Sequence, residues 1–168
     1  MSELKTVDHK LCAELLAAAA DSPRLRSHKN MHARLDEPVQ RLLIALQRGT
    51  YVQPHRHPQA HKWELILAVQ AETLLLLFDD DGKVTERFVL SPANSPLALE
   101  LPSKIWHTVL PLQQTSVILE VKQGPFDPRE GADFAPWAPQ EGEPAVADFL
   151  LWAQQAELGG RYDSGWRG

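Results

Sequence analysis

A short stretch near the middle of the chain holds side chains whose types and spacing fit metal chemistry. His55 and His57 are two residues apart, so on an extended strand they point to the same face. Glu64 follows seven residues after His57, and Pro58 disfavours an unbroken strand, so a turn through residues 58–62 is expected to aim Glu64 back toward the histidines. Two neutral imidazoles and one carboxylate suit a divalent transition ion. The alternative is a surface turn with solvated histidines.

Further polar residues are candidates to complete or border such a site. His107 comes much later, after a turn at Pro102, and a lone distant histidine is by itself more often packed or solvated. The segment 24–41 is rich in basic side chains. Because arginine binds carboxylate or phosphate through two hydrogen bonds, one interpretation is a basic lip for an anionic ligand, and the other is a solvated connector. The additional candidates are His61, Arg41, Arg34 and Lys29.

Composition places the chain among ordinary globular proteins. It has 168 residues, 43% hydrophobic and 23% charged, which predicts one domain with a sizeable core. A net charge of -5 gives no electrostatic support for nucleic-acid binding. Cys12 is the single cysteine, so no intramolecular disulfide can form. No signal-peptide pattern occurs, and no apolar run approaches the roughly 18 residues of a membrane span, so we expect a cytoplasmic protein without a membrane partner.

The hydrophobic pattern predicts a mainly β protein with a helix at each end. Helical periodicity covers residues 8–20 and 145–158, and a proline-rich arm precedes the second helix. Between them, short strands separated by turn residues indicate a sandwich or barrel. The expected strands cover residues 39–46, 53–57, 63–69, 74–78, 86–90, 97–101 and 117–122. Within a single domain we divide the chain into an N-terminal helix and basic connector (1–38), a β-barrel (39–125), and the arm with the C-terminal helix (126–168).

Two motifs resemble a known family. The pattern Gly49-x5-His55-x-His57-x6-Glu64-x6-Ala71 is similar to the first cupin motif, and Pro102-x-Lys104-x2-His107 is similar to the second. More narrowly, the chain resembles WbuC-type cupin fold metalloproteins. The pieces that carry this resemblance are Ser22-Pro-Arg24, Pro38-Val-Gln-Arg-Leu-Leu43, Pro54-His-Arg-His-Pro58, Lys62-Trp-Glu64, Leu77-Phe-Asp-Asp-Asp-Gly82, Trp106-His107 and Leu119-Glu-Val-Lys-x-Gly-Pro125.

The resemblance implies a cupin-type β-barrel, also called a double-stranded β-helix or jelly roll, with a metal inside. It implies His55, His57, Glu64 and His107 as ligands of one divalent transition metal, which we expect to be zinc, iron, nickel or manganese. The family motifs have glycine where this chain has Ala71 and Lys104. If those sites need a positive φ, each non-glycine residue costs about 1 kcal/mol.

Function remains open at this level among three classes. The leading hypothesis is a metal-dependent enzyme acting on a small polar molecule, for example a sugar or nucleotide-sugar derivative. The resemblance implies an association with bacterial surface polysaccharide synthesis and does not specify a reaction. The second is a metal-dependent carbohydrate-binding or sensor module without catalysis, and the third is a barrel that the metal only stabilises. We also expect a homodimer, with the apolar residues 65–69 and 74–78 offering material for its interface.

Overall fold

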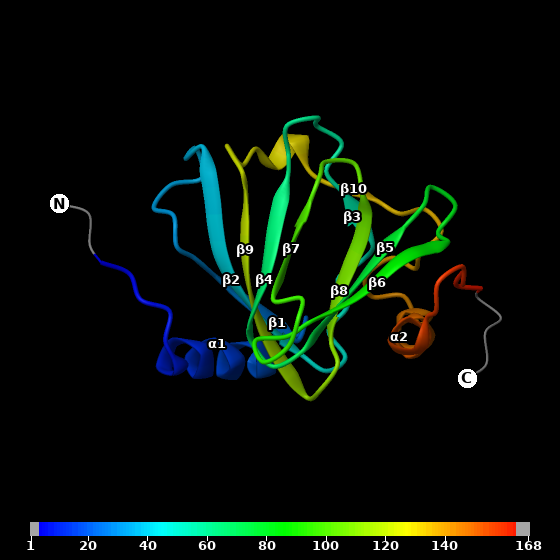
Figure 1. The fold of residues 1–168 in the computed structure, drawn as a ribbon, viewed down its shortest axis with the longest axis horizontal. Coiled ribbons are helices and arrows are strands. Elements are labelled where there is room, and N and C mark those ends of the chain that lie inside the picture. Colours follow the sequence, from blue (N-terminus) through cyan, green and yellow to red (C-terminus); the bar gives the residue numbers. More distant parts are fainter. Residues whose placement is uncertain (1–3, 164–168) are drawn as a thin grey trace.

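The computed structural model describes residues 4–163, and Figure 1 shows a β core with a helix on either side. The first helix, α1, runs from His9 to Asp21, and Asp8 caps it by accepting a hydrogen bond from the Leu11 N–H at 2.9 Å. The second, α2, covers Val146–Gln155. The strands are β1 (Arg26–Asn30), β2 (Val39–Gln47), β3 (His55–Arg56), β4 (Glu64–Gln70), β5 (Thr73–Phe78), β6 (Val84–Leu90), β7 (Ala98–Leu101), β8 (Trp106–Pro111), β9 (Thr115–Gln123) and β10 (Asp133–Phe134).

The strands form two antiparallel sheets that face each other. One has the order β1-β2-β9-β4-β7 and the other the order β10-β3-β8-β5-β6. Strands adjacent in sequence therefore lie in different sheets at several points, and the turn after β3 carries the chain from the second sheet to the first. The predicted mainly β class with a helix before and after the strands is confirmed.

Four layers result, because each sheet buries one face against the other sheet and one against a helix (Figure 1). Alternation along β2 shows this: Leu43 and Ala45 pack with Cys12 of α1, whereas Ile44 and Leu46 belong to the cluster between the sheets. On the other side, the second sheet packs against α2. The residues of that outer cluster include Leu74, Leu76, Phe78, Phe149 and Trp152.

The connector predicted between residues 24 and 38 contains the strand β1. Its sequence Arg-Ser-His-Lys-Asn has no apolar alternation, so the hydrophobic pattern does not predict a strand. It forms because β2 offers a free edge: Arg26 pairs with Leu46, and Asn30 pairs with Leu42. Backbone pairing at a sheet edge therefore adds a polar strand to an apolar one.

The proline-rich arm also takes part in the sheets. Its two-residue strand β10 pairs with β3, so that Phe134 lies opposite His55 and Asp133 opposite Arg56. The two positions where the motifs have glycine are left-handed, with φ of 59° at Ala71 and 69° at Lys104. Within residues 4–163, no helix is long and apolar enough to cross a membrane. The ends of the first and last predicted segments, residues 1–3 and 164–168, lie outside the described residues.

Candidate metal centre

The four side chains predicted as ligands come together where the two sheets meet. His55 on β3 is the direct cross-strand partner of His107 on β8, and their ring centroids are 4.4 Å apart. His57 follows β3, and its ring centroid is 5.7 Å from that of His55. Glu64 begins β4 in the opposite sheet, after the turn that the proline predicts. The turn thus aims the carboxylate at the histidines, as the sequence indicates.

Backbone carbonyls fix two of the imidazole rings. His55 Nδ1 lies 2.9 Å from the Gln53 carbonyl oxygen, and His107 Nδ1 lies 3.0 Å from that of Ile105. Because a carbonyl can only accept, both Nδ1 atoms donate, and each neutral ring keeps its lone pair on Nε2. Histidines that bind metals commonly hold their second nitrogen in this way.

Glu64 is 3% exposed and contacts two of the histidines. Its Oε1 lies 2.9 Å from His57 Nε2, and its Oε2 lies 3.2 Å from His107 Nε2. The contact between Glu64 and His57 is as short as a hydrogen bond, but its angles do not fit one. The buried His57 Nε2 therefore has no hydrogen-bond partner among residues 4–163.

Among the described residues, no group of three or more His, Cys, Asp or Glu side chains is already arranged to hold a metal ion. Glu64 instead lies directly against the imidazoles of His57 and His107 and against Lys122, whose Nζ is 3.5 Å from Oε1. The donor types nevertheless fit a transition ion, because three nitrogens and one carboxylate oxygen face one another in a buried place. The unpartnered Nε2 of His57 is the atom that such an ion would satisfy.

Burial controls the charge states at this site. Burial, reinforced by the neighbouring His107, lowers the pKa of His55 to about 3, so this imidazole is neutral near pH 7. Burial alone would lower the pKa of His107, but its bond to Glu64 outweighs this and raises it. Burial would raise the pKa of Glu64, but its close contacts with His107 and His57 hold the pKa well below the usual value. Glu64 is therefore ionised, and its charge favours a cation between these groups.

Lys122 on β9 is a site residue that the sequence analysis does not single out. Its Nζ lies 2.6 Å from Glu120 Oε1 as well as 3.5 Å from Glu64. Burial would lower the pKa of Lys122, but the charges of Glu120 and Glu64 outweigh it and raise the pKa. The signal that could reveal this residue is a Glu-x-Lys pair inside an otherwise apolar strand, since such a pair puts both charges on one face.

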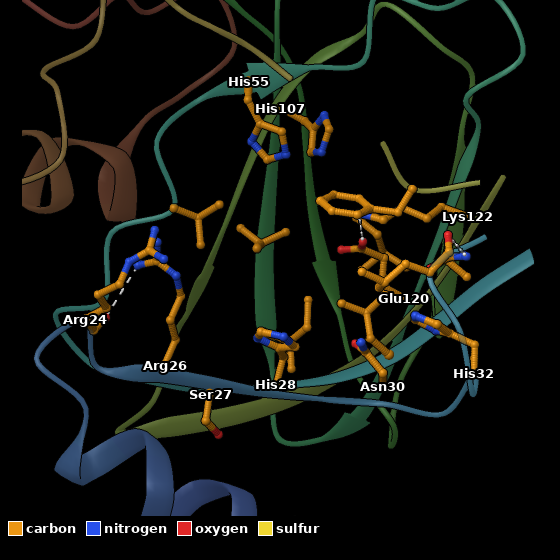
Figure 2. A pocket seen from close by; sticks show the side chains of 18 residues that line it. Arg24, Arg26, Ser27, His28, Asn30, His32, His55, His107, Glu120 and Lys122 are labelled. Atoms are coloured by element: carbon orange, nitrogen blue, oxygen red, sulfur yellow. Dashed lines mark hydrogen bonds and ion pairs between the residues drawn. The ribbon is translucent and has the colours of Figure 1, made fainter. Parts of the chain in front are cut away.

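A cavity of about 580 Å³ opens beside the histidines. Figure 2 shows His55 and His107 at one end, with Arg24 and Arg26 on one side and Glu120 and Lys122 on the other. Its volume is in the range of small-molecule sites. Aliphatic side chains line the wall between these polar groups; they are Leu42, Ile44, Val52, Ile66 and Val109.

The additional candidates from the sequence lie away from this cavity. Arg41 donates to Glu37 at 2.6 Å, and Arg34 donates to Asp36 at 2.8 Å, so protein carboxylates pair with both. The remaining two are exposed, and neither is among the residues that line the cavity; they are Lys29 and His61. Their participation in ligand binding stays a prediction.

The fold and its neighbours identify the class of protein. Two facing antiparallel sheets with this strand order are the cupin fold, and solved structures with TM-scores above 0.5 share it. Similar solved structures include CapF with the inhibitor 3-isopropenyl-tropolone, at a TM-score of 0.57 and 17% identity over 68% of this chain and 32% of that chain. Recombinant oxalate oxidase in complex with glycolate has a TM-score of 0.52 and 16% identity, over 82% of this chain and 69% of that chain. A cupin superfamily protein from Desulfitobacterium hafniense has a TM-score of 0.45 and 16% identity, over 58% of this chain and 76% of that chain.

At these identities the structural neighbours show the fold alone. The chain spans about a third of CapF. No curated protein matches the sequence. Residues 7–90 match the family described as Domain of unknown function (DUF6016), and the chain belongs to this family.

Proposed function

We propose that this cupin is a metal-dependent enzyme whose ligands are His55, His57, Glu64 and His107. One observation carries the proposal: imidazole nitrogens and an ionised, 3% exposed carboxylate converge at the wall of a cavity large enough for a substrate. The ion we expect is a single divalent zinc, iron, nickel or manganese, because imidazole with one carboxylate suits these metals.

When bound, such an ion would polarise a carbonyl group or activate water or dioxygen. The chain's own residues hold and orient it. The carbonyls of Gln53 and Ile105 set the rings of His55 and His107, and the Lys122 ammonium restrains the Glu64 carboxylate. Aliphatic side chains along the cavity keep water away from the reacting groups.

The substrate in this proposal is a small polar molecule that enters the 580 Å³ cavity. The resemblance to WbuC-type proteins supports a sugar or nucleotide-sugar derivative and a role in surface polysaccharide metabolism. Arg41 and Arg34, the cations predicted to hold an anionic ligand, are instead paired with Glu37 and Asp36. The charge of the ligand is therefore better judged from the residues that do line the cavity.

Turnover is the property that separates an enzyme from a binding or sensor module. Wild-type protein loaded with each candidate ion is incubated with a panel of sugars and nucleotide sugars, and products are followed by mass spectrometry. We expect a product from at least one combination and none after His107→Ala. Saturable binding of panel members by the metal-loaded protein, without product from any of them, would contradict catalysis and support the sensor alternative.

A further inference from the structure

His32 is a buried polar side chain that the proposed metal site does not use. It is 6% exposed, it lines the cavity, and its Nε2 has no hydrogen-bond partner among residues 4–163. Figure 2 shows its ring turned toward the cavity. Leaving a buried polar group unpaired costs about 1–3 kcal/mol. A ligand that offers a partner to this nitrogen would recover that free energy.

The backbone of Arg41 decides which ring nitrogen of His32 carries the proton. The Arg41 N–H donates to His32 Nδ1 at 3.0 Å. Because a backbone N–H can only donate, Nδ1 accepts, and the ring proton lies on Nε2. The Arg41 carbonyl oxygen is also 2.9 Å from Nδ1, but it already accepts from the Met31 N–H at 2.7 Å. His32 Nε2 is therefore a buried hydrogen-bond donor without a partner in the described chain, on a side chain that lines the cavity.

The strand register puts an acceptor on the same wall. Asn30 pairs with Leu42, and Leu42 pairs with Glu120, so these three side chains form one row across one face of the sheet. His32 follows the end of β1, and Lys122 lies two residues beyond Glu120 on the same face of β9. His32, Glu120 and Lys122 all line the cavity, on one side of it in Figure 2.

Glu120 limits which ligand group can occupy this place. Its side chain is 13% exposed, and its Oε1 contacts the Lys122 ammonium at 2.6 Å, outside the direction of a hydrogen bond. A carboxylate has lone pairs enough to accept further bonds. The Glu120 carboxylate would repel a ligand carboxylate or phosphate placed directly against it. A hydroxyl group can accept from His32 and also donate to Glu120.

We propose that His32 and Glu120 form a subsite for a hydroxyl group of a neutral, polyhydroxylated ligand. The aliphatic wall of the cavity would cover its carbon skeleton, as suits the C–H face of a pyranose ring. The inference rests on the proposed function in taking the cavity as the substrate pocket. It deepens that function by assigning the substrate class, a neutral polyol in place of an anion.

The test uses methyl pyranosides as probes, with acetate and inorganic phosphate at matched ionic strength as anions. Binding to the full chain is measured by calorimetry, and the His32 Nε2 resonance is followed in protein labelled with ¹⁵N-histidine. At least one pyranoside should bind saturably and shift that resonance. Its affinity should fall about tenfold in His32→Phe, which removes one hydrogen bond to a ligand, and stay unchanged in the exposed control His9→Phe.

A second variant covers the case in which His32→Phe does not fold. Glu120→Gln keeps the side-chain shape and removes the charge, so pyranoside affinity should fall and acetate affinity should rise. Equal pyranoside affinity in wild type and Glu120→Gln, no pyranoside binding at all, or tighter binding of acetate or phosphate to wild type would each overturn the subsite. Titrations are run with and without bound metal, so that failure of the metal proposal is seen separately.

Discussion

The three histidines of the site differ in their hydrogen-bond partners. A backbone carbonyl orients His55 and another orients His107, whereas His57 has no hydrogen-bond partner on its buried Nε2 within the described chain. Glu64 contributes the negative charge that a divalent ion would neutralise. A ligand set of this kind should lose affinity whenever one donor is removed.

Replacing single donors therefore tests the assignment residue by residue. Ala at His55, His57 or His107 should each lower bound metal at least about tenfold while the circular dichroism spectrum is kept. Glu64→Gln should weaken binding less, because the amide keeps an oxygen donor but loses the charge. Metal content is measured after dialysis, with His9→Ala on the exposed surface of α1 as the control. Full occupancy in His107→Ala would remove that residue from the site.

Two non-glycine residues show what the motif comparison predicts well. Ala71 and Lys104 replace motif glycines, and both have positive φ in the structure. The sequence could not reveal His32 in the same way, because its role depends on which polar atoms remain unpaired in the fold, and that property has no local sequence pattern. Lys122 has only the Glu-x-Lys pair of β9 as a signal, and its contact with Glu64 depends on the cross-strand register.

At the scale of elements, the long apolar strands β2 and β5 were predictable and the polar strands β1 and β10 were not. The buried strand β8 was also missed, because its six residues follow the turn at Pro102 and were not recognised as a strand. β2 and β5 bury Leu43, Leu46, Leu74 and Leu76 completely, which explains their near-continuous apolar runs. β1 and β10 instead depend on partners that the fold supplies. This matters for the cavity, because the polar β1 supplies several of its lining residues.

An ion-pair network joins the N-terminal end of β1 to the proline-rich arm. Glu141 accepts from Arg24 at 2.8 and 2.6 Å and from Arg26 at 3.2 Å. The bonds from Arg24, and then those from Arg26, lower the pKa of Glu141 to about 2. A lowered carboxyl pKa gives stability that is complete above the unfolded-state value and is lost as the pH falls toward the folded-state value.

Glu141→Gln should therefore lower the free energy of unfolding by about 0.5–1 kcal/mol near pH 7, a small value because the pair is partly exposed. The difference from wild type should shrink as the pH falls from 4.5 toward 2, the two pKa values of this carboxyl. Urea unfolding at several pH values measures it. A difference that is constant over this range would show that Glu141 acts without its charge.

The hairpin between β5 and β6 supports the site through Asp80, which accepts from Arg56 and from the Trp106 indole N–H. Its Gly82 has φ +80°, and a Cβ there would lie 2.6 Å from Trp137. Gly142 is a matched control, because it has φ +93° and open space around it.

Gly82→Ala should lower the free energy of unfolding by about 2–4 kcal/mol, since it adds a clash to the backbone strain. Gly142→Ala should cost only about 1 kcal/mol, which is the strain alone. Both values come from urea unfolding at one pH. Equal losses in the two variants would mean that the Trp137 side chain moves away freely and does not fix the hairpin.

At the scale of the whole molecule, the candidate ligands meet between the two sheets, at one end of the cavity. The meeting of His55, His57, Glu64 and His107 was predictable because the resemblance includes both motifs that contain them, and their role as metal ligands stays a prediction. The lining of the cavity was not predictable, since it combines residues of β1 with residues of strands that are distant in sequence.

Assembly is a second property of the whole molecule. The homodimer stays a prediction, and the structure narrows which surface could form it. On β5, Leu74, Leu75 and Leu76 are 0% exposed within the single chain, so this strand has no apolar surface left at these positions. Leu65 and Leu67 on β4 remain partly exposed. We expect wild type to have a dimeric mass by light scattering at micromolar concentration. The double variant Leu65→Glu, Leu67→Glu should have a mass closer to that of the monomer. A monomeric wild type would contradict the homodimer.

The central claim is that the three histidines and Glu64 hold one transition ion. Elemental analysis of the protein, purified without added metal and without a metal-affinity step, tests it most directly. We predict close to one equivalent of zinc, iron, nickel or manganese per folded chain, and a strongly reduced amount in His107→Ala purified in parallel. A folded wild-type protein that contains none of these metals, and that takes up none when each is supplied, would contradict the account.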